Sequence, residues 1–257
     1  MQIKDKTIVI TGGASGLGFA TAQYLSQRGA RIALIDLDES AGQTAVTRLG
    51  AERCSFQRAD VTDEAGVSAA IAQILSRFGA IHVLINCAGI PAPCKVLDRQ
   101  AKATALEKFA RVVNVNLIGI FNVMSKCAET MARNEAENGE ERGVVINISS
   151  GAAYEGQIGQ CAYAASKSGV LGLNMPAARE LGAMGIRVNA ICPGLFGTPM
   201  VNSLDQKVQD ALVEMIEAPK RMGHMEEFAH CCAFLIENGY MNGRTIRLDA
   251  ATVMQAK

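Results

Sequence analysis

The sequence lacks the features that mark metal-binding, membrane-spanning and nucleic-acid-binding proteins. It has eight cysteines without a Cys-x-x-Cys pair and only three histidines, so no metal site is predicted. No apolar run reaches the roughly 20 residues that a membrane-spanning helix needs. The 25 basic and 25 acidic residues leave no net charge, and this balance indicates neither nucleic acid nor an anionic membrane as a partner.

The sequence also offers little to suggest secretion or disulfide bonding. Met1 is followed almost directly by a predicted strand at residues 7–10, which leaves no room for a secretory signal. We therefore expect a cytoplasmic protein with buried free thiols, the mitochondrial matrix being the alternative location. Cys231 and Cys232 form the one pair that suggests redox chemistry, but on a predicted helix at residues 226–236 they are better interpreted as core contacts.

Strand-like and helical segments alternate along the chain. Five short apolar runs predict buried strands, at residues 8–10, 31–35, 82–85, 144–148 and 187–191. Such alternation is typical of an α/β fold, here a doubly wound parallel sheet of the Rossmann type flanked by helices. With 257 residues, 49% of them hydrophobic, and no repeat or linker, the chain is expected to form a single domain over residues 1–257.

Two segments depart from this alternation. Residues 195–223 form a long excursion after the last of the five predicted strands, and such a segment is often a mobile lid over a ligand. The polar stretch Asn134–Arg142 predicts a solvated loop between a helix and a strand.

A glycine-rich turn, Thr11-Gly-Gly-Ala-Ser-Gly-Leu-Gly18, follows the first predicted strand. Gly12, Gly16 and Gly18 allow a tight turn and let a pyrophosphate approach the N-terminus of the next helix. Asp36 ends the second predicted strand, where a carboxylate accepts bonds from an adenine ribose and repels a 2′-phosphate. The pattern favours NAD over NADP; the alternative is that Asp36 is only a helix N-cap or a turn residue before Asp38.

Tyr163 and Lys167 are four residues apart on a predicted helix, which places both on the same face. A fixed ammonium beside a phenol lowers the pKa of the phenol from its usual value of about 10 and so prepares a general base. Ser150 follows a predicted strand and lies at the carboxyl edge of the sheet, where such folds bind their ligands. The alternative is that Tyr163 is a core residue and Lys167 a solvated surface charge.

Together these motifs resemble the short-chain dehydrogenase/reductase family over essentially the whole chain. The family pattern matches at Thr11–Gly18, Asn86–Gly89, Asn116–Leu117, Ser150, Tyr163 with Lys167, and Pro193–Gly194. The resemblance implies that Tyr163 exchanges a proton with the substrate oxygen, that Ser150 orients that oxygen, and that Lys167 also holds the nicotinamide ribose. It implies that Asn116 holds a water linked to Lys167, with Asn114 as the competing candidate.

The resemblance also implies the contacts of the cofactor and substrate. Where NADP-preferring members carry a basic residue, this chain has Ser15 and Leu37, in agreement with NAD. The substrate contacts implied are Ser150, Tyr163 and Gln160. The cofactor contacts implied are Gly12, Ser15, Gly16, Leu17, Gly18, Asp36, Leu37, Asp60, Val61, Asn86, Cys87, Ala88, Gly89, Tyr163, Lys167, Pro193, Gly194, Phe196 and Thr198.

Within the family, the chain looks most like the type-2 3-hydroxyacyl-CoA dehydrogenases, also described as the 17β-hydroxysteroid dehydrogenase type 10 branch. The segments that carry this likeness are 155–160, 193–199, an insertion after Gly89 and 246–249. The likeness implies interconversion of L-3-hydroxyacyl-CoA and 3-ketoacyl-CoA in fatty acid metabolism by a homotetramer. The ending Asp249-Ala-Ala251 departs from the wider family, many of whose members have a glycine-rich ending.

The insertion at residues 91–104 carries three basic side chains, Lys95, Arg99 and Lys102. They are expected to lie near the mouth of the site, where they are suited to CoA phosphates; the alternative is that they are ordinary surface charges.

Three other functions stay open at this stage. The same catalyst could act on a hydroxysteroid or another secondary alcohol, or the chain could be a dinucleotide-binding scaffold without activity. A 3-oxoacyl carrier-protein reductase fits the fold but usually uses NADPH, which Asp36 disfavours.

Overall fold

A computed structural model describes residues 1–137 and 139–256 as one α/β layered fold around a seven-stranded sheet. The sheet has the order β3-β2-β1-β4-β5-β6-β7, and all its strand pairs are parallel. The chain thus winds outward from β1 in one direction and from β4 in the other, which confirms the predicted doubly wound sheet. The strands are β1 (Thr7–Thr11), β2 (Arg31–Asp36), β3 (Cys54–Arg58), β4 (Val83–Asn86), β5 (Gly143–Ile148), β6 (Ile186–Pro193) and β7 (Thr245–Leu248).

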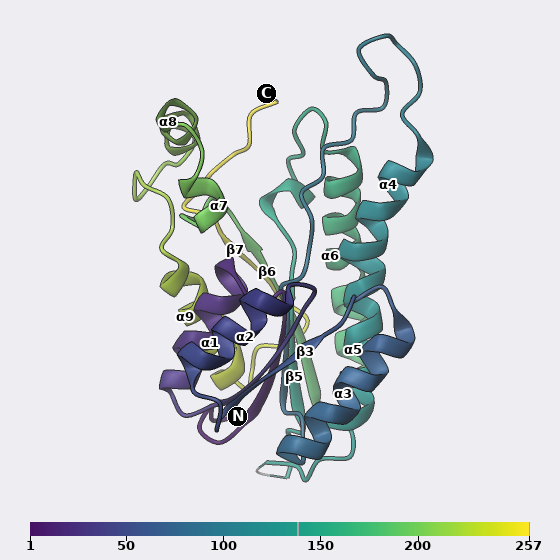
Figure 1. The fold of residues 1–257 in the computed structure, drawn as a ribbon, viewed down its shortest axis with the longest axis vertical. Helices are drawn as coiled ribbons and strands as arrows, with labels where there is room; N and C mark the ends of the chain where they lie inside the picture. Colours follow the sequence, from purple (N-terminus) through teal and green to yellow (C-terminus); the bar gives the residue numbers. More distant parts are fainter. Residues whose placement is uncertain (138, 257) are drawn as a thin grey trace.

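Helices cover both faces of the sheet (Figure 1). On one face lie α1 (Gly16–Gln27), α2 (Glu39–Leu49) and α9 (Met225–Glu237). On the other lie α3 (Glu64–Phe78), α5 (Gly119–Met131) and α6 (Cys161–Gly182), with α4 (Leu106–Val113) continuing into α5 through a π-helical turn, η1 (Asn114–Ile118). A short 3₁₀ turn, η2 (Gly151–Ala153), follows β5, and α7 (Pro199–Asn202) and α8 (Gln206–Glu214) follow β6.

The hydrophobic core is divided by the sheet into two parts. Along β1, Ile8 and Ile10 pack toward α1 and α9, while Val9 packs toward α3 and α5. Because side chains alternate between the faces of a strand, a strand covered on both sides is buried at every position and is mostly apolar. All five residues of β1 are indeed buried.

Two strands, β3 and β7, are not among the five predicted ones. They are the two edge strands of the sheet, and their sequences Cys-Ser-Phe-Gln-Arg and Thr-Ile-Arg-Leu mix polar and apolar residues. An edge strand is only partly covered, so it does not need the continuous apolar run by which the central strands are recognised.

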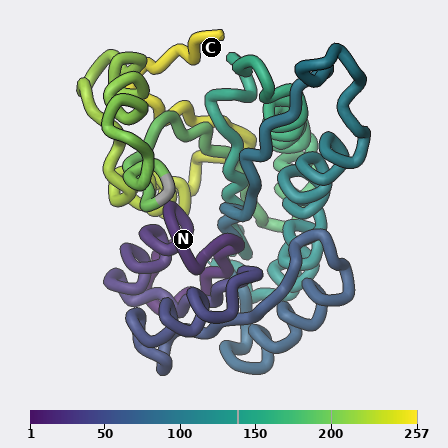
Figure 2. The backbone as a smooth tube through the Cα atoms, turned by 45° about the horizontal axis from the view of Figure 1, so that its top comes forward, coloured from purple at the N-terminus to yellow at the C-terminus, as the bar shows by residue number. Residues whose placement is uncertain are grey.

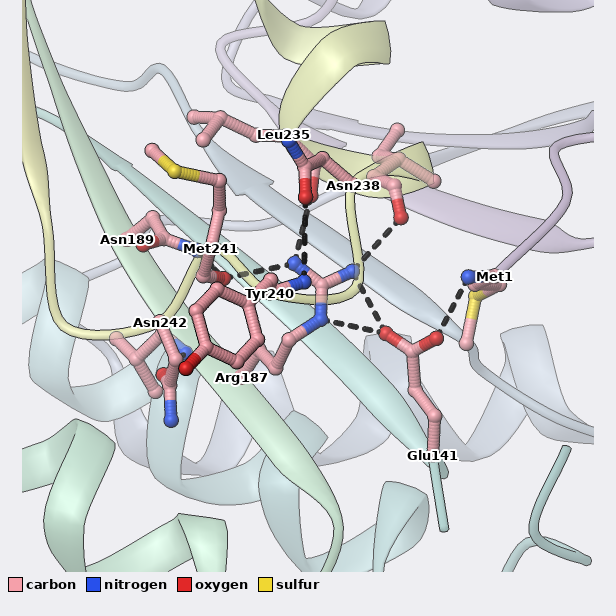
Figure 3. Close-up of polar contacts among 11 residues, drawn as sticks. Met1, Glu141, Arg187, Asn189, Leu235, Asn238, Tyr240, Met241 and Asn242 are labelled. Atoms are coloured by element: carbon pink, nitrogen blue, oxygen red, sulfur yellow. Dashed lines mark hydrogen bonds and ion pairs between the residues drawn. The ribbon is translucent and has the colours of Figure 1, made fainter. Parts of the chain in front are cut away.

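The stretch Asn134–Arg142 lies between α5 and β5, as predicted, although Asn138 lies outside the described residues. It is not only a solvated loop, because the Glu141 carboxylate accepts a 2.6 Å hydrogen bond from Arg187 Nε and a 2.6 Å ion-pair contact from the Met1 ammonium (Figure 3). Arg187 is 7% exposed. Its guanidinium also donates to the carbonyls of Leu235, Ile236 and Met241 at 2.7–2.9 Å.

This cluster of Arg187, Glu141, the Met1 ammonium and the three carbonyls, here named the Arg187 network, caps the C-terminal end of α9. The last carbonyls of a helix have no partner within the helix, and a cation is stabilised at that end by the helix dipole. Arg187, at the start of β6, therefore supplies the partner that the last turn of α9 needs and fixes this helix to the sheet.

Four irregular segments gather at the opposite end of the sheet, beyond the carboxyl ends of the strands (Figures 1 and 2). They are the insertion (residues 91–104), the loop of residues 151–160, the lid segment (residues 195–223) and the C-terminal residues 249–256. None of the helices within residues 1–137 and 139–256 is long and apolar enough to span a membrane.

Candidate active site

A cleft of about 760 Å³ opens at the carboxyl ends of β1, β2 and β4, where the winding direction of the sheet reverses. Its floor is the glycine-rich turn after β1. Gly12 has a φ of +62°, and a Cβ atom there would lie 2.9 Å from the Ala88 nitrogen. A side chain at this position would therefore push apart β1 and β4, and only glycine lets the two strand ends meet beneath the cleft.

The N-terminus of α1 points into the cleft and has spare hydrogen-bond donors. Ser15 occupies the N-cap position, but its side chain makes no capping hydrogen bond. Gly16 has a φ of +53°, and a Cβ atom there would meet nothing within 4 Å. The first turn of the helix thus has no capping side chain, and the space beside Gly16 is open. This is the arrangement that accommodates a pyrophosphate.

Asp36 lies at the rim of the cleft in a fixed orientation. Its carboxylate accepts hydrogen bonds from the Ala14 nitrogen at 3.1 Å and from the Leu37 nitrogen at 2.7 Å. It does not cap α2, because Asp38 performs that role by accepting from the Ala41 nitrogen at 3.0 Å. Asp36 is therefore not the N-cap of α2. Its carboxylate also accepts from the Asp38 nitrogen at 3.3 Å, as a turn residue does, and it is held beside the glycine-rich turn by the Ala14 nitrogen.

Most of the predicted cofactor contacts line this cleft. The glycine-rich turn, the end of β2, the residues after β3 and the end of β4 contribute Gly12, Ser15, Gly16, Leu17, Gly18, Asp36, Leu37, Asp60, Val61, Cys87, Ala88 and Gly89, and the lid segment contributes Thr198. The residues present thus fit a dinucleotide: a bare helix N-terminus for its phosphates and a carboxylate for its ribose.

Other predicted contacts lie elsewhere. Asn86 is buried and donates to Asn147 Oδ1 at 2.9 Å, so its side chain joins β4 to β5. The Phe196 ring packs edge-on against Phe228 at 6.0 Å in the core. Pro193 and Gly194 pass beside the end of β7, where a Cβ on Gly194 would lie 2.7 Å from the Asp249 Cα atom.

The predicted catalytic side chains converge just beyond this cleft. Ser150 follows β5, while Tyr163 and Lys167 lie on α6. The Ser150 hydroxyl forms a hydrogen bond with the Tyr163 hydroxyl, and Lys167 Nζ lies 5.8 Å from the centroid of the Tyr163 ring. Lys167 is 4% exposed and donates to the Ile148 carbonyl at 2.8 Å, so it is not a solvated surface charge.

Burial is the main cause of the pKa shifts of Tyr163 and Lys167. Burial raises the pKa of Tyr163, and the hydrogen bond from Ser150 offsets this only in part. Burial also lowers the pKa of Lys167 to about 8. The net pKa of Tyr163 is therefore raised in the protein alone, because desolvation of the phenolate is the larger effect. The lowering of this pKa by the Lys167 ammonium stays a prediction.

Asn116 occupies the π-helical turn η1 and is fully buried. Its side chain accepts from the Ile90 nitrogen at 2.8 Å and donates to the Ile90 carbonyl at 3.0 Å and to Ser166 Oγ at 3.2 Å. A Cβ on Gly89 would lie 3.2 Å from Asn116 Oδ1 and 3.4 Å from Lys167 Nζ. Asn116 and Lys167 thus flank the same glycine, whereas Asn114 lines the dinucleotide cleft.

Gln160 occupies the N-cap position of α6, three residues before Tyr163, but its side chain makes no capping hydrogen bond. Its side chain contacts Gln157, accepting from the Gln157 nitrogen at 3.1 Å. The insertion is paired with this region, since the Cys94 nitrogen donates to the Gly159 carbonyl at 2.6 Å. Lys95, Arg99 and Lys102 are exposed, and a Cβ on Gly159 would lie 3.7 Å from Lys95 Cγ.

The sequence did not indicate the wall of the cleft formed by α4. Glu107, Ala110 and Arg111 line the cleft from this helix. No motif marks them, because their position depends on how α4 packs against α6 and not on any local pattern.

As a whole, the site combines a dinucleotide-sized cleft with two linked hydroxyls and a buried amine. Two hydroxyls that share a hydrogen bond can bind one substrate oxygen and pass a proton to or from it. Nothing in the arrangement resembles a nucleophile with an adjacent histidine base. The chemistry that fits is proton transfer at an alcohol or carbonyl oxygen coupled to a redox step.

Comparisons with known proteins agree with this geometry. The family model described as short chain dehydrogenase matches residues 6–209. The chain is 48% identical to 3-hydroxyacyl-CoA dehydrogenase type-2 of Bos taurus and 47% identical to that of Homo sapiens, over 99% of this chain and 97% of each relative. The crystal structure of 3-hydroxyacyl-CoA dehydrogenase type-2 from Mycobacterium avium superposes with a TM-score of 0.92 at 37% identity, covering 98% of this chain and 97% of that one. The chain therefore belongs to the short-chain dehydrogenase family of oxidoreductases.

Proposed function

We propose that the protein is an NAD-dependent dehydrogenase that interconverts L-3-hydroxyacyl-CoA and 3-ketoacyl-CoA. The observation that carries this proposal is the linked pair of hydroxyls of Ser150 and Tyr163 beside a cleft with a bare helix N-terminus and a carboxylate rim. The substrate class is supported by the names of the relatives, since those with 46–48% identity over 99% of the chain are 3-hydroxyacyl-CoA dehydrogenases type-2.

The roles of the catalytic residues follow from their positions. Tyr163 gives a proton to the ketone oxygen in reduction and takes it back in oxidation, while Ser150 bonds the same oxygen and fixes its orientation. Lys167, held by the Ile148 carbonyl, places positive charge behind the phenol. The nicotinamide dinucleotide supplies or accepts the hydride when it is bound.

NAD is preferred over NADP in this proposal because of the residues around the ribose end of the cleft. Asp36 is held there by three backbone N–H groups, so its carboxylate cannot easily turn away from a 2′-phosphate. Neither Ser15 nor Leu37 can neutralise such a phosphate, and both line the cleft.

The CoA part of the substrate would meet the insertion. Lys95, Arg99 and Lys102 are exposed on it, and its root pairs with the loop that precedes Tyr163. In this proposal a thioester reaches Ser150 and Tyr163 from the side of the insertion, where the three cations are suited to phosphate groups.

The first experiment is a comparison of substrates and cofactors. The rate of NADH oxidation is measured with acetoacetyl-CoA, with free acetoacetate and with a steroid ketone, and NADPH is the control for the cofactor. Turnover of the thioester with NADH alone supports the proposal. Turnover of only the steroid or the simple ketone contradicts the substrate class, and tight NADH binding without any turnover contradicts the activity itself.

We further propose a homotetramer. Apolar side chains that a monomer would leave in water follow one side of α4, η1 and α5: Leu106, Phe109, Ile118 and Phe121 are 36–79% exposed, which is unusual for a protein with few aromatic residues. Light scattering of the purified protein tests the assembly, and a monomer at micromolar concentration contradicts it. The cytoplasmic location stays a prediction that cell fractionation would test.

A further inference from the structure

The C-terminal tail, residues 249–256, is attached to the loop that joins Ser150 to Tyr163, here named the substrate loop (residues 151–160). The Ile158 nitrogen donates to the Ala256 carbonyl at 3.1 Å, and Gln157 Nε2 donates to the Gln255 carbonyl at 3.0 Å. The Glu155 carboxylate accepts from the Met254 nitrogen at 3.3 Å. Three successive residues of the tail are thus hydrogen-bonded to the substrate loop.

The same tail is attached to the lid segment on its other side. The Ala250 carbonyl accepts from the nitrogens of Glu217 and Ala218 at 3.2 and 3.4 Å. In Figures 1 and 2 the yellow C-terminal end lies between the green lid segment and the teal segment that includes the substrate loop. The tail is therefore a bridge between the lid segment and the substrate loop.

The tail is bent into this position by an unusual backbone turn. Ala250 and Ala251 have φ values of +50° and +55°, a conformation that residues with a Cβ rarely adopt. Such a turn persists only where surrounding contacts hold it. Here the contacts are on both sides of the turn, because Arg247 Nη2 donates to the Thr252 carbonyl at 3.2 Å.

Arg247 and Glu155 are the charged anchor of this bridge. The Arg247 guanidinium donates to both oxygens of Glu155, at 2.9 and 3.4 Å, and to Asp249 at 2.6 Å. Its centre also lies 5.1 Å from the ring of Tyr154. Because Glu155 accepts from Arg247 on β7 and from Met254 in the tail, one carboxylate joins the sheet edge, the tail and the substrate loop.

We propose that Glu155 and Arg247 are a positioning pair that fixes the substrate loop and, through the C-terminal tail, holds the lid segment over the substrate. The proposal deepens the function proposed above and rests on it for the identity of the substrate. Neither side chain takes part in the chemistry. The pair acts on how well the substrate is held, so its loss raises the Michaelis constant more than it lowers the turnover number.

The test compares Glu155→Gln with Glu237→Gln. Glu237 accepts two hydrogen bonds from Arg28, at 2.8 and 3.2 Å, so the control loses an ion pair of the same geometry on α9, away from the substrate loop. The arginines of the two pairs have similar side-chain exposure, 35% for Arg247 and 37% for Arg28. Each variant is assayed with acetoacetyl-CoA and NADH, and amide hydrogen exchange is followed without any ligand.

For Glu155→Gln we expect a Michaelis constant for the thioester about tenfold higher, a turnover number within about twofold of the wild type, and unchanged NADH affinity. The amides of Ile158, Glu217 and Ala218 should exchange about tenfold faster, whereas Glu237→Gln should change none of these values. Unchanged exchange at these three amides, or an unchanged Michaelis constant, overturns the proposal.

A second variant removes the bridge and keeps the ion pair. A chain that stops after Val253 loses the contacts of the tail with Glu155, Gln157 and Ile158, and it should show the same rise in the Michaelis constant and the same faster exchange of the Ile158 amide. Normal binding by this truncated chain overturns the role of the tail. Failure of the substrate class would show instead as absent thioester turnover in the wild type, while the exchange experiment would still decide the contacts.

Discussion

Among single residues, Tyr163 and Lys167 were predicted from their spacing, and the structure places them together with Ser150. Their ionisation could not be predicted in the same way, because it depends on how much water reaches each group. Burial raises the pKa of Tyr163 and lowers the pKa of Lys167 to about 8. Spacing along a helix shows which groups share a face, but desolvation depends on the whole fold around them.

The raised pKa of Tyr163 predicts different pH profiles for the two reaction directions. Reduction of the ketone needs the neutral phenol, which burial maintains at neutral pH, so its rate should be nearly flat between pH 6 and 8. Oxidation of the alcohol needs the phenolate, and its rate should rise by up to about tenfold per pH unit above neutrality. Initial rates in both directions test this, and an oxidation rate that is flat from pH 7 to 9 contradicts it. Tyr163→Phe should lack both activities but still bind NADH.

Lys167 predicts a pH dependence of stability. Its pKa is about 8 when folded against a usual 10.5, so the unfolded chain binds the proton more tightly. The resulting loss of stability is complete below pH 8 and is relieved as the pH rises from 8 to 10.5, by at most about 3 kcal/mol. Urea unfolding without cofactor should show that the wild type becomes more stable relative to Lys167→Met over this range. A constant difference between the two proteins would contradict the assignment.

Asp36 predicts how cofactor preference can be reversed. Asp36→Asn combined with Leu37→Arg removes the repulsive carboxylate and adds a cation at the rim of the cleft. The ratio of kcat/KM for NADPH to that for NADH should increase on the order of 100-fold. Steady-state kinetics with both cofactors measure this ratio, with Leu37→Met as the control. No increase would mean that the ribose lies away from the end of β2.

At the scale of elements, the central strands and the helices between them could be predicted, whereas the edge strands β3 and β7 and the π-helical turn η1 could not. Central strands can be recognised in the sequence because both of their faces are buried, which makes them continuous, mostly apolar runs. A π-helical turn has one residue more than an α-helical turn, so η1 changes which side chains of α4 and α5 face α6. The segment is too short for this change to be seen in its hydrophobic periodicity. Asn116 was identified by family likeness, and the turn explains its inward direction.

The insertion is an element whose proposed role can be tested as a unit. Replacing Lys95, Arg99 and Lys102 by Gln should raise the Michaelis constant for acetoacetyl-CoA by about tenfold or more, because each cation near a phosphate contributes a charge-assisted bond. The constant for free acetoacetate should stay unchanged. A control variant with Gln at Lys4, Arg133 and Arg179, near the amino ends of the strands, should bind the thioester normally. Equal constants for the two triple variants would show that the insertion carries only surface charges.

For the whole molecule, stability and chemistry are placed at opposite ends of the sheet. The Arg187 network closes α9 at the amino end of β6, and the site lies beyond the carboxyl ends. The sequence-based interpretation missed this network, because it took the acidic stretch that includes Glu141 as solvated and Arg187 as the first residue of an ordinary strand.

Removal of one member of the network should destabilise the protein without changing its kinetics. Arg187→Met leaves Glu141 and several carbonyls without their partner and should lower the free energy of unfolding by about 3–5 kcal/mol. Urea unfolding measures this loss, while the Michaelis constants of the folded fraction should remain within about twofold of the wild type. Arg133→Met, which breaks an exposed pair with Glu129, should cost less than about 1 kcal/mol. Similar losses for the two variants would contradict the role of the network.

The layout of β6 has a consequence for how such a protein can change over time. This strand begins at the Arg187 network and ends at Pro193, just before the lid segment. One element thus separates a set of residues that stabilises the fold from a set that surrounds the site. Substitutions that adjust melting temperature to a warmer or colder habitat can accumulate at one end, while a new acyl chain or a new alcohol is accommodated by loops at the other. Substitutions that change the melting temperature and substitutions that change the substrate can then accumulate independently of each other.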